Sequence, residues 1–228
     1  MKKLPVIIAV IGLLATTLTG TAQTFSIKAG LTFANLHSES DGPDSLFDQK
    51  LKHGYQLGAM AEFPLSERLA IETGLIFSTK GYRIKEDIES GFGPSYEYKG
   101  RLELLYVEVP IQLTGTCKVG KLNFFGTFGP YLGYGIYGRF KDEFTIFGET
   151  ETTSDDVKWG NDKTEDFIKR LDYGLTAGAG VDLNKFRIGL SYSYGLANIS
   201  SFTDGNTKVQ NRVIGIAVSY RFKKNVSE

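Results

Sequence analysis

Eight segments of alternating side chains are joined by connections that are in turn long and short. The short connections read PLSER, CKVGK and DLNK, whereas the others run from about a dozen to more than twenty residues and are rich in Asp, Glu, Ser, Thr and Gly. Antiparallel strands that run up and down place every second connection at the same end, so one end has turns and the other has loops. We expect strands near residues 24–36, 53–64, 68–82, 101–116, 121–140, 167–183, 185–197 and 210–222.

Each of these segments has one face without a charged residue. In the first segment this face carries Phe25, Ile27, Ala29, Leu31 and Phe33. The opposite faces together carry eleven charged residues, which are Lys28, Glu62, Glu72, Lys80, Glu108, Arg139, Arg170, Asp172, Asp182, Arg187 and Arg221. A surface in contact with water would not leave a whole face of every strand uncharged, so the pattern favours strands that face lipid.

A soluble eight-stranded barrel of the lipocalin type is the alternative, with an apolar interior and a wet outside. An eight-stranded barrel is barely wide enough for its own side chains, so it would not accommodate so many aromatic and aliphatic groups. In hydrocarbon, unpaired backbone groups are too costly for an open sheet, so spanning strands must close into a ring. We therefore predict an all-β fold, an eight-stranded antiparallel up-and-down transmembrane β-barrel of the size of OmpA or OmpX.

The stretch LNFFGTFGPYLGYGIYG, residues 122–138, could be mistaken for a membrane helix because it is long, apolar and uncharged. Each interior glycine would cost a helix about 1 kcal/mol relative to alanine, and Pro130 would cost about 3 kcal/mol. A strand is therefore expected, with its apolar side chains towards lipid. Since Pro130 cannot donate to a closed ladder, we expect a local bulge there.

The N-terminus has the features of a secretory signal peptide. Lys2 and Lys3 precede an apolar stretch over residues 4–18, and Gly20-Thr21-Ala22 provides small residues at a cleavage site. We expect a signal peptide over residues 1–22, a barrel domain over 23–222 and a short polar tail over 223–228. The protein would then lie in the cell outer membrane with both termini in the periplasm.

Composition excludes some classes of partner and of cross-link. Removal of both signal lysines leaves 24 basic against 26 acidic side chains, a formal net charge of −2, so no nucleic-acid partner is expected. Cys117 is the only cysteine, which rules out an intramolecular disulfide and favours a small hydrophobe near a turn.

Three stretches resemble a known family. FSIKAGLTFANL, LLYVEVPIQLTGTCKVGKLNFF and GTFGPYLGYG are similar to the Bacteroidota-type outer-membrane β-barrel domain family, whose members are often labelled PorT-like. The most specific part is the Tyr106–Pro110 step followed by Gly129-Pro130-Tyr131. The resemblance implies a small outer-membrane barrel, and only some relatives are linked to a secretion machine. The expected partners are outer-membrane lipid and lipopolysaccharide, the barrel-assembly machinery, and an extracellular or secretion-system protein.

The lumen-facing charges are nearly balanced, which favours mutual pairing over a pore lining of one sign. We expect Glu72 and Glu108 to lie close together and to share a cation or a proton, and Asp182 and Arg187 flank the same tight turn. A structural network that plugs the lumen is predicted from Lys28, Glu72, Glu108, Arg139, Arg170, Asp172, Asp182, Arg187 and Arg221.

No catalytic, cofactor or metal site is predicted. His37 and His53 border the first long loop, where solvated side chains are a better interpretation than a catalytic base. The third long loop, residues 142–166, is acidic and holds Trp159, so we interpret it as a solvated loop, a contact surface or a weak calcium site. The leading functional hypothesis is a monomeric, non-enzymatic scaffold that acts through its long loops. A narrow channel or conduit for hydrophobic molecules, and an accessory of a secretion system, are the alternatives.

Overall fold

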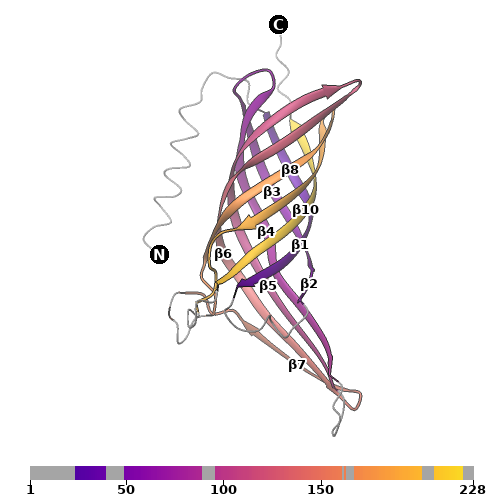
Figure 1. Ribbon diagram of the computed structural model, residues 1–228, viewed down its shortest axis with the longest axis vertical. Coiled ribbons are helices and arrows are strands. Elements are labelled where there is room, and N and C mark those ends of the chain that lie inside the picture. Colours follow the sequence, from indigo (N-terminus) through magenta and orange to yellow (C-terminus); the bar gives the residue numbers. More distant parts are fainter. Residues whose placement is uncertain are drawn as a thin grey trace.

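The computed structural model describes residues 24–39, 49–88, 96–160, 162, 167–201 and 208–222. Within these residues it has ten strands (Figure 1), which are β1 (Thr24–Glu39), β2 (Gln49–Lys50), β3 (Lys52–Pro64), β4 (Leu69–Ile88), β5 (Tyr96–Val119), β6 (Leu122–Ile146), β7 (Glu149–Asp156), β8 (Leu171–Leu183), β9 (Phe186–Gly195) and β10 (Lys208–Phe222). The described residues contain no helix that is long and apolar enough to cross a membrane. The predicted signal peptide and C-terminal tail lie outside the described residues.

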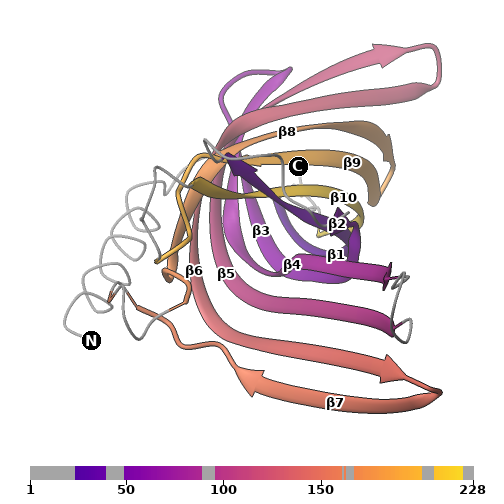
Figure 2. The ribbon, with the colours of Figure 1, turned by 60° about the horizontal axis from the view of Figure 1, so that its bottom comes forward.

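Eight strands close into an antiparallel ring in the order β1, β3, β4, β5, β6, β8, β9, β10. The ring closes because β1 pairs with β10 along its whole length, from Phe25 opposite Phe222 to Glu39 opposite Lys208. The two remaining strands are additions: β2 pairs with β4, and β7 pairs with β6. The predicted eight-stranded up-and-down barrel is therefore confirmed (Figure 2).

The two ends of the barrel differ. Tight turns at residues 65–68, 120–121 and 184–185 share one end, which we call the short-turn end, together with the first and last described residues. The opposite, long-loop end carries the longer connections. At this end three strands are longer than predicted. β4 continues to Ile88, β5 begins at Tyr96 and β6 continues to Ile146. These extensions and β7 project beyond the ring (Figure 1).

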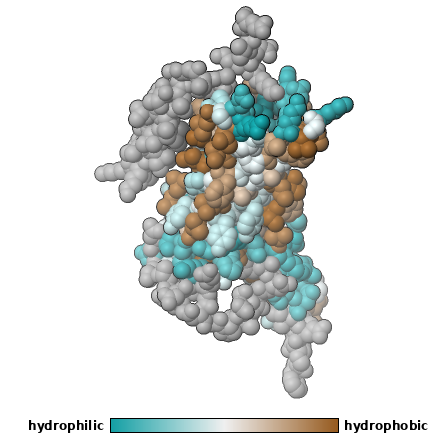
Figure 3. Space-filling view, turned by 45° about the horizontal axis from the view of Figure 1, so that its top comes forward, coloured by the Kyte–Doolittle hydropathy of each residue, from teal (hydrophilic) through white to brown (hydrophobic). Residues whose placement is uncertain are grey.

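The outward face of the ring is apolar. Phe25 and Leu31 of β1 are 53% and 58% exposed, and Leu190 of β9 and Ile216 of β10 are 56% and 48% exposed. In Figure 3, hydrophobic side chains cover the waist of the molecule and hydrophilic ones gather towards its ends. An exposed apolar belt of this extent marks a membrane-facing surface rather than one in water.

Irregular pairing between β5 and β6 changes which side chains face the lumen. Tyr106 is opposite Gly135 but Leu105 is opposite Tyr137, so Ile136 is an extra residue in β6. Ile136 and Tyr137 consequently both point outward, and the alternation of β6 is reversed beyond them. The bulge expected at Pro130 was wrongly placed, because pairing with β5 is interrupted opposite Pro130 without any change of register.

Candidate functional site

The lumen near the short-turn end is crossed by an arginine cluster, consisting of Glu62, Glu72, Asp182, Arg187 and Arg221. Arg187 forms two parallel hydrogen bonds with Asp182, Nε to Oδ1 at 2.7 Å and Nη2 to Oδ2 at 3.0 Å. Its Nη1 also lies 2.9 Å from Glu72 Oε2 and 3.1 Å from Glu62 Oε2. One guanidinium therefore binds carboxylates from three other strands, which is the planar, forked geometry that arginine suits best.

Arg221 completes this cluster from β10. Its Nη1 lies 2.9 Å from Asp182 Oδ2 and its Nη2 lies 3.1 Å from Glu62 Oε1, so both carboxylates bridge the two arginines. The Arg187 guanidinium also stacks 4.4 Å from the centre of the Phe125 ring. Three carboxylates against two guanidinium groups give the arginine cluster a formal charge of −1.

A second layer, the lysine cluster, lies on the long-loop side and is formed by Lys80, Glu108, Tyr131, Asp172 and Asn211. Lys80 donates to Asp172 Oδ2 at 2.8 Å and forms an ion pair with Glu108. Asn211 Nδ2 and Tyr131 Oη donate to the same Asp172 oxygen at 2.9 and 3.3 Å. Lys80 and Asp172 are 1% and 0% exposed, so the layer excludes water almost completely. Its formal charge is also −1.

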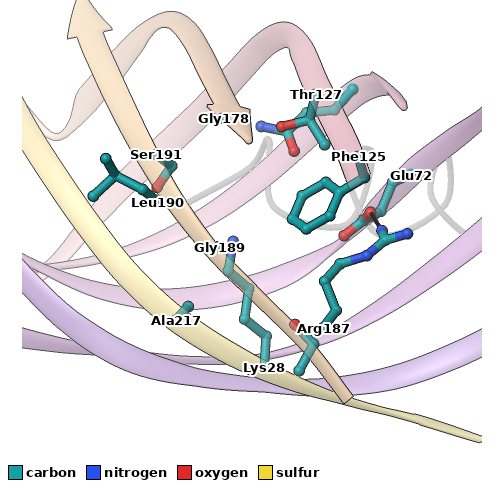
Figure 4. A pocket seen from close by; sticks show the side chains of 12 residues that line it. Lys28, Glu72, Phe125, Thr127, Gly178, Arg187, Gly189, Leu190, Ser191 and Ala217 are labelled. Atoms are coloured by element: carbon teal, nitrogen blue, oxygen red, sulfur yellow. Dashed lines mark hydrogen bonds and ion pairs between the residues drawn. The ribbon is translucent and has the colours of Figure 1, made fainter. Parts of the chain in front are cut away.

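Lys28 lies between the two clusters. Its ammonium group points into a cavity of about 40 Å³ (Figure 4), and no carboxylate of the described residues is within ion-pair distance of it. Glu72, Gln112, Thr127 and Arg187 are among the lining residues. At about 15 Å³ per water, the cavity has room for two or three molecules that would solvate the ammonium. The positive charge of Lys28 offsets part of the excess negative charge of both layers.

The structure divides six of the predicted network residues between the two clusters. Glu72, Asp182, Arg187 and Arg221 meet in the arginine cluster, whereas Glu108 and Asp172 belong to the lysine cluster. The expectation that Glu72 and Glu108 lie close together and share a cation or a proton is wrong. Glu108 is opposite Ile76, four residues along β4 from Glu72, and Arg187 binds Glu72 whereas Lys80 binds Glu108. Curvature of the ring explains this difference, since it brings β9 and β4 together across the lumen.

Arg139 and Arg170 do not belong to these clusters. The placement of Arg139 in the lumen was wrong: its side chain is 53% exposed and lies 3.6 Å from Asp156 of β7. The extra residue Ile136 is the cause, because it turns every later side chain of β6 to the other face. Arg170 donates to the backbone carbonyl of Gly135 at 2.9 Å and lies over the ring of Trp159.

Two lumen residues were missing from the predicted network. Lys80 and Glu62 fall on the charged faces of their segments, so their orientation could be read from the alternation. Their roles depend on contacts between strands that are distant in sequence, and no local pattern reports those. Lys80 is the cation at the centre of one layer, and Glu62 bridges both arginines of the other.

An apolar plug fills the lumen at the long-loop end. Its buried members are Leu36, Leu102, Leu104, Tyr106, Val157, Ile168, Ala197 and Ile199. Strands supply the first four, and the irregular segments after β7 and β9 supply the rest. Val157 donates its backbone N–H to Gly138 O at 2.9 Å, and the Trp159 ring meets the Tyr106 ring edge-on at 5.9 Å. The interpretation of residues 142–166 as a solvated loop was therefore wrong for Val157 and Trp159, which pack in the plug.

The other residues considered as possible sites, a histidine and the cysteine, lie outside the lumen clusters. His53 is an exposed β3 residue that packs edge-on against Phe33 of β1, with ring centres 5.3 Å apart. Cys117 lies next to the tight turn at residues 120–121, as expected, and its side chain is exposed. Within the part of the chain that the structure describes, no three His, Cys, Asp or Glu side chains are grouped as metal ligands.

Comparison with known proteins identifies the family. Residues 21–201 match the model of the outer membrane protein β-barrel domain family. The chain belongs to this family. It is accordingly an outer-membrane β-barrel protein, as the apolar belt and the closed ring require.

Solved structures with likeness to the chain include three outer-membrane proteins. Ail of Yersinia pestis is 19% identical, with 89% of this chain and 100% of Ail covered and a TM-score of 0.35. Neisserial surface protein A is 11% identical, with coverage of 87% and 97% and a TM-score of 0.34. AlkL, solved in lipid bilayers, is 14% identical, with coverage of 92% and 95% and a TM-score of 0.40. No curated protein sequence matches the chain.

Proposed function

We propose that this protein is a non-enzymatic, monomeric outer-membrane scaffold with a plugged lumen, which acts through the surface at its long-loop end. The observation that carries this proposal is the stacking of three closed layers in one lumen. The arginine cluster, the lysine cluster and the apolar plug follow one another from the short-turn end to the long-loop end. A barrel so filled offers no continuous path for solutes, so its accessible surfaces are its lipid face and its two ends.

The proposal includes the finer assignments made from the sequence. A cleaved signal over residues 1–22, a barrel domain over 23–222 and a tail over 223–228 fit an outer-membrane protein. Periplasmic termini fit the position of the first and last described residues beside the tight turns. Membership of the PorT-like group within the family rests on the resemblance of the Tyr106–Pro110 step and is part of the same proposal.

Single-channel recording in planar lipid bilayers tests the plugged lumen. Protein refolded into detergent, with its folded state verified by heat-modifiable gel mobility, is expected to insert without any steady conductance. A double variant that removes the charged layers, Lys80→Ala with Arg187→Ala, should also stay closed, because the apolar plug still fills the long-loop end. An open general porin, inserted under the same conditions, is the positive control for steady conductance. Steady, ion-selective conductance by the unaltered protein would contradict the scaffold and support the channel hypothesis.

A further inference from the structure

At the long-loop end, a sheet formed by extensions of the barrel strands projects beyond the ring and ends in an open edge. The outer parts of β4, β5 and β6 continue past the apolar belt, and β7 adds a further strand to them (Figure 2). Within the described residues β7 pairs only with β6, and all eight of its residues are exposed. In an antiparallel pair, alternate residues turn both backbone groups away from the partner. The free side of β7 therefore presents a row of unpaired donors and acceptors.

The projecting sheet satisfies its other polar groups internally. On its outward face Lys85 lies 2.9 Å from Glu97, Lys99 lies 3.0 Å from the same carboxylate, and Lys141 lies 2.7 Å from Glu143. On the face that continues the lumen, Tyr98 donates to Asp142 at 2.9 Å. Because both faces are occupied by their own contacts, unused bonding capacity remains at the edges of the sheet, where β7 presents eight exposed residues.

The tip of the β6–β7 hairpin has an unusual residue. Phe147 and Gly148 form the two-residue turn with φ angles of 53° and 83°. Positive φ at both central positions defines a type I′ turn, in which Asn-Gly is strongly preferred. A bulky residue with positive φ is an outlier that costs about 1–3 kcal/mol. The Phe147 side chain is also 86% exposed, so this cost is not offset by burial in the protein itself.

The acidic residues of β7 indicate which kind of partner could pair with its free edge. Glu149, Glu151, Asp155 and Asp156 give β7 four acids in eight residues, and within the described residues only Asp156 has an ion-pair partner. Two copies of β7 paired edge to edge would place these acids near one another, which disfavours a second copy of this chain. An anionic lipid surface would repel the same strand. Lysine or arginine side chains on an added strand would instead meet opposite charges.

We propose that the free edge of β7 binds an extended, basic segment of a partner protein by strand addition, with Phe147 as an apolar anchor at one end. Backbone hydrogen bonds to the edge supply affinity in this mode, and side chains supply specificity. The acids of β7 select lysine and arginine, and Phe147 inserts into an apolar site of the partner. This inference rests on the proposed function, because it needs the long-loop end to face outward from the cell.

The test measures peptide binding to the full-length mature protein in nanodiscs. The probe is a labelled peptide of about eight residues, the length of β7, in which lysine alternates with valine and threonine. Fluorescence anisotropy is expected to show saturable binding. The same peptide with one central residue replaced by proline, which cannot donate to the ladder, should not bind. Hydrogen exchange should show new protection in β7 when the lysine peptide is present.

Variants separate the two contributions. The double variant Glu149→Lys with Glu151→Lys should weaken peptide binding about tenfold or more, since two attractive cross-strand pairs become repulsive. Phe147→Asn should weaken binding of a peptide extended by an apolar residue while it stabilises the turn, because asparagine tolerates positive φ. Asp87→Lys is the matched control: it removes an acid that is 70% exposed on another strand and should leave binding unchanged.

The outcomes distinguish this inference from the proposed function. Equal binding of the lysine and proline peptides, or no loss in the Glu149 and Glu151 variant, would overturn the strand-addition mode. Binding of the nanodisc protein to anionic vesicles, or sedimentation as a dimer that the same variant abolishes, would also overturn it in favour of a different occupant. In each of these cases the absence of conductance would still support the plugged scaffold, whereas steady conductance with intact peptide binding would contradict only the scaffold.

Discussion

Arg187 on β9 contacts Glu72 on β4 across the full width of the lumen, with 2.9 Å between Nη1 and Oε2. In the ring these two strands are separated by β3, β1 and β10 on one side and by β5, β6 and β8 on the other, so they are diametrically opposite. A single arginine thus connects opposite walls of the barrel. Its removal should loosen the whole ring rather than one strand pair.

Arg187→Gln should lower the free energy of unfolding by about 3–5 kcal/mol, because it leaves three carboxylates with only Arg221 as a counter-charge. Equilibrium unfolding in urea, measured in lipid vesicles, provides the value. Arg139→Gln is the control, since its 53% exposed side chain and 3.6 Å contact predict a loss of no more than about 1 kcal/mol. Similar losses for the two variants would refute the cross-lumen role.

The lysine cluster has two carboxylates and one ammonium group, so its variants should differ in stability. Lys80→Met leaves Glu108 and Asp172 buried without their cation, so a loss of about 3–5 kcal/mol is expected. Asp172→Asn instead leaves Glu108 paired with Lys80 and keeps a hydrogen-bond acceptor at position 172. Its expected loss of unfolding free energy is therefore about 1–3 kcal/mol. Combining both changes should cost less than the sum of the single losses. Equilibrium unfolding in urea tests both values. A greater loss of unfolding free energy for Asp172→Asn than for Lys80→Met would contradict this account.

Periodicity explains why the barrel could be predicted from the sequence. Lipid requires an uninterrupted apolar face on every strand, so residues such as Phe25 and Leu31 mark the outside at every second position. The alternation of tight and long connections then sets strand number and direction. The same alternation assigns most of the charged residues to the lumen face.

Other features of the site had no local signal. A single extra residue, Ile136, reversed the orientation of Arg139, and nothing in the composition of β6 marks that position. The hairpin was missed because its turn is Phe147-Gly148 rather than Asn-Gly, so the strands were ended too early. The plug segment around Trp159 has no periodicity, and its packing depends on contacts with Tyr106 and other β5 residues that are distant in sequence.

Tyr98 predicts a pH dependence of the projecting sheet. Burial and its hydrogen bond to Asp142 raise the pKa of Tyr98 to about 12. A raised pKa means that the contribution of this group to stability is complete below about pH 10 and is lost as the pH rises through 12. Absorbance is titrated against pH for the unaltered protein and for Tyr98→Phe. The difference between the two curves should show one phenol that ionises near pH 12. Asp142→Asn should move its pKa partly back towards 10, and an unchanged value would contradict the role of the hydrogen bond.

Cys117 provides a natural test of orientation. It is exposed at the short-turn end, which should face the periplasm, so a membrane-impermeant maleimide should label it only after the outer membrane is permeabilised. Phe147→Cys, made together with Cys117→Ser, should be labelled on intact cells because residue 147 is at the tip of the projecting hairpin. Labelling in the reverse order would invert the topology and remove the outward-facing surface from the proposed function.

Trp159, the only tryptophan, reports on the plug. A Cβ atom at Gly135 would lie 2.3 Å from the Trp159 ring, so Gly135→Val should push the ring out of the barrel mouth. Emission should then shift to longer wavelength, and quenching by iodide should increase, because water replaces the contact with Tyr106. Gly126→Ala is the matched control in the same strand, since its Cβ would have a neighbour only at 3.9 Å. If both variants kept the original emission and quenching, the mouth of the barrel would have to be more open than the buried Val157 and Ile199 indicate.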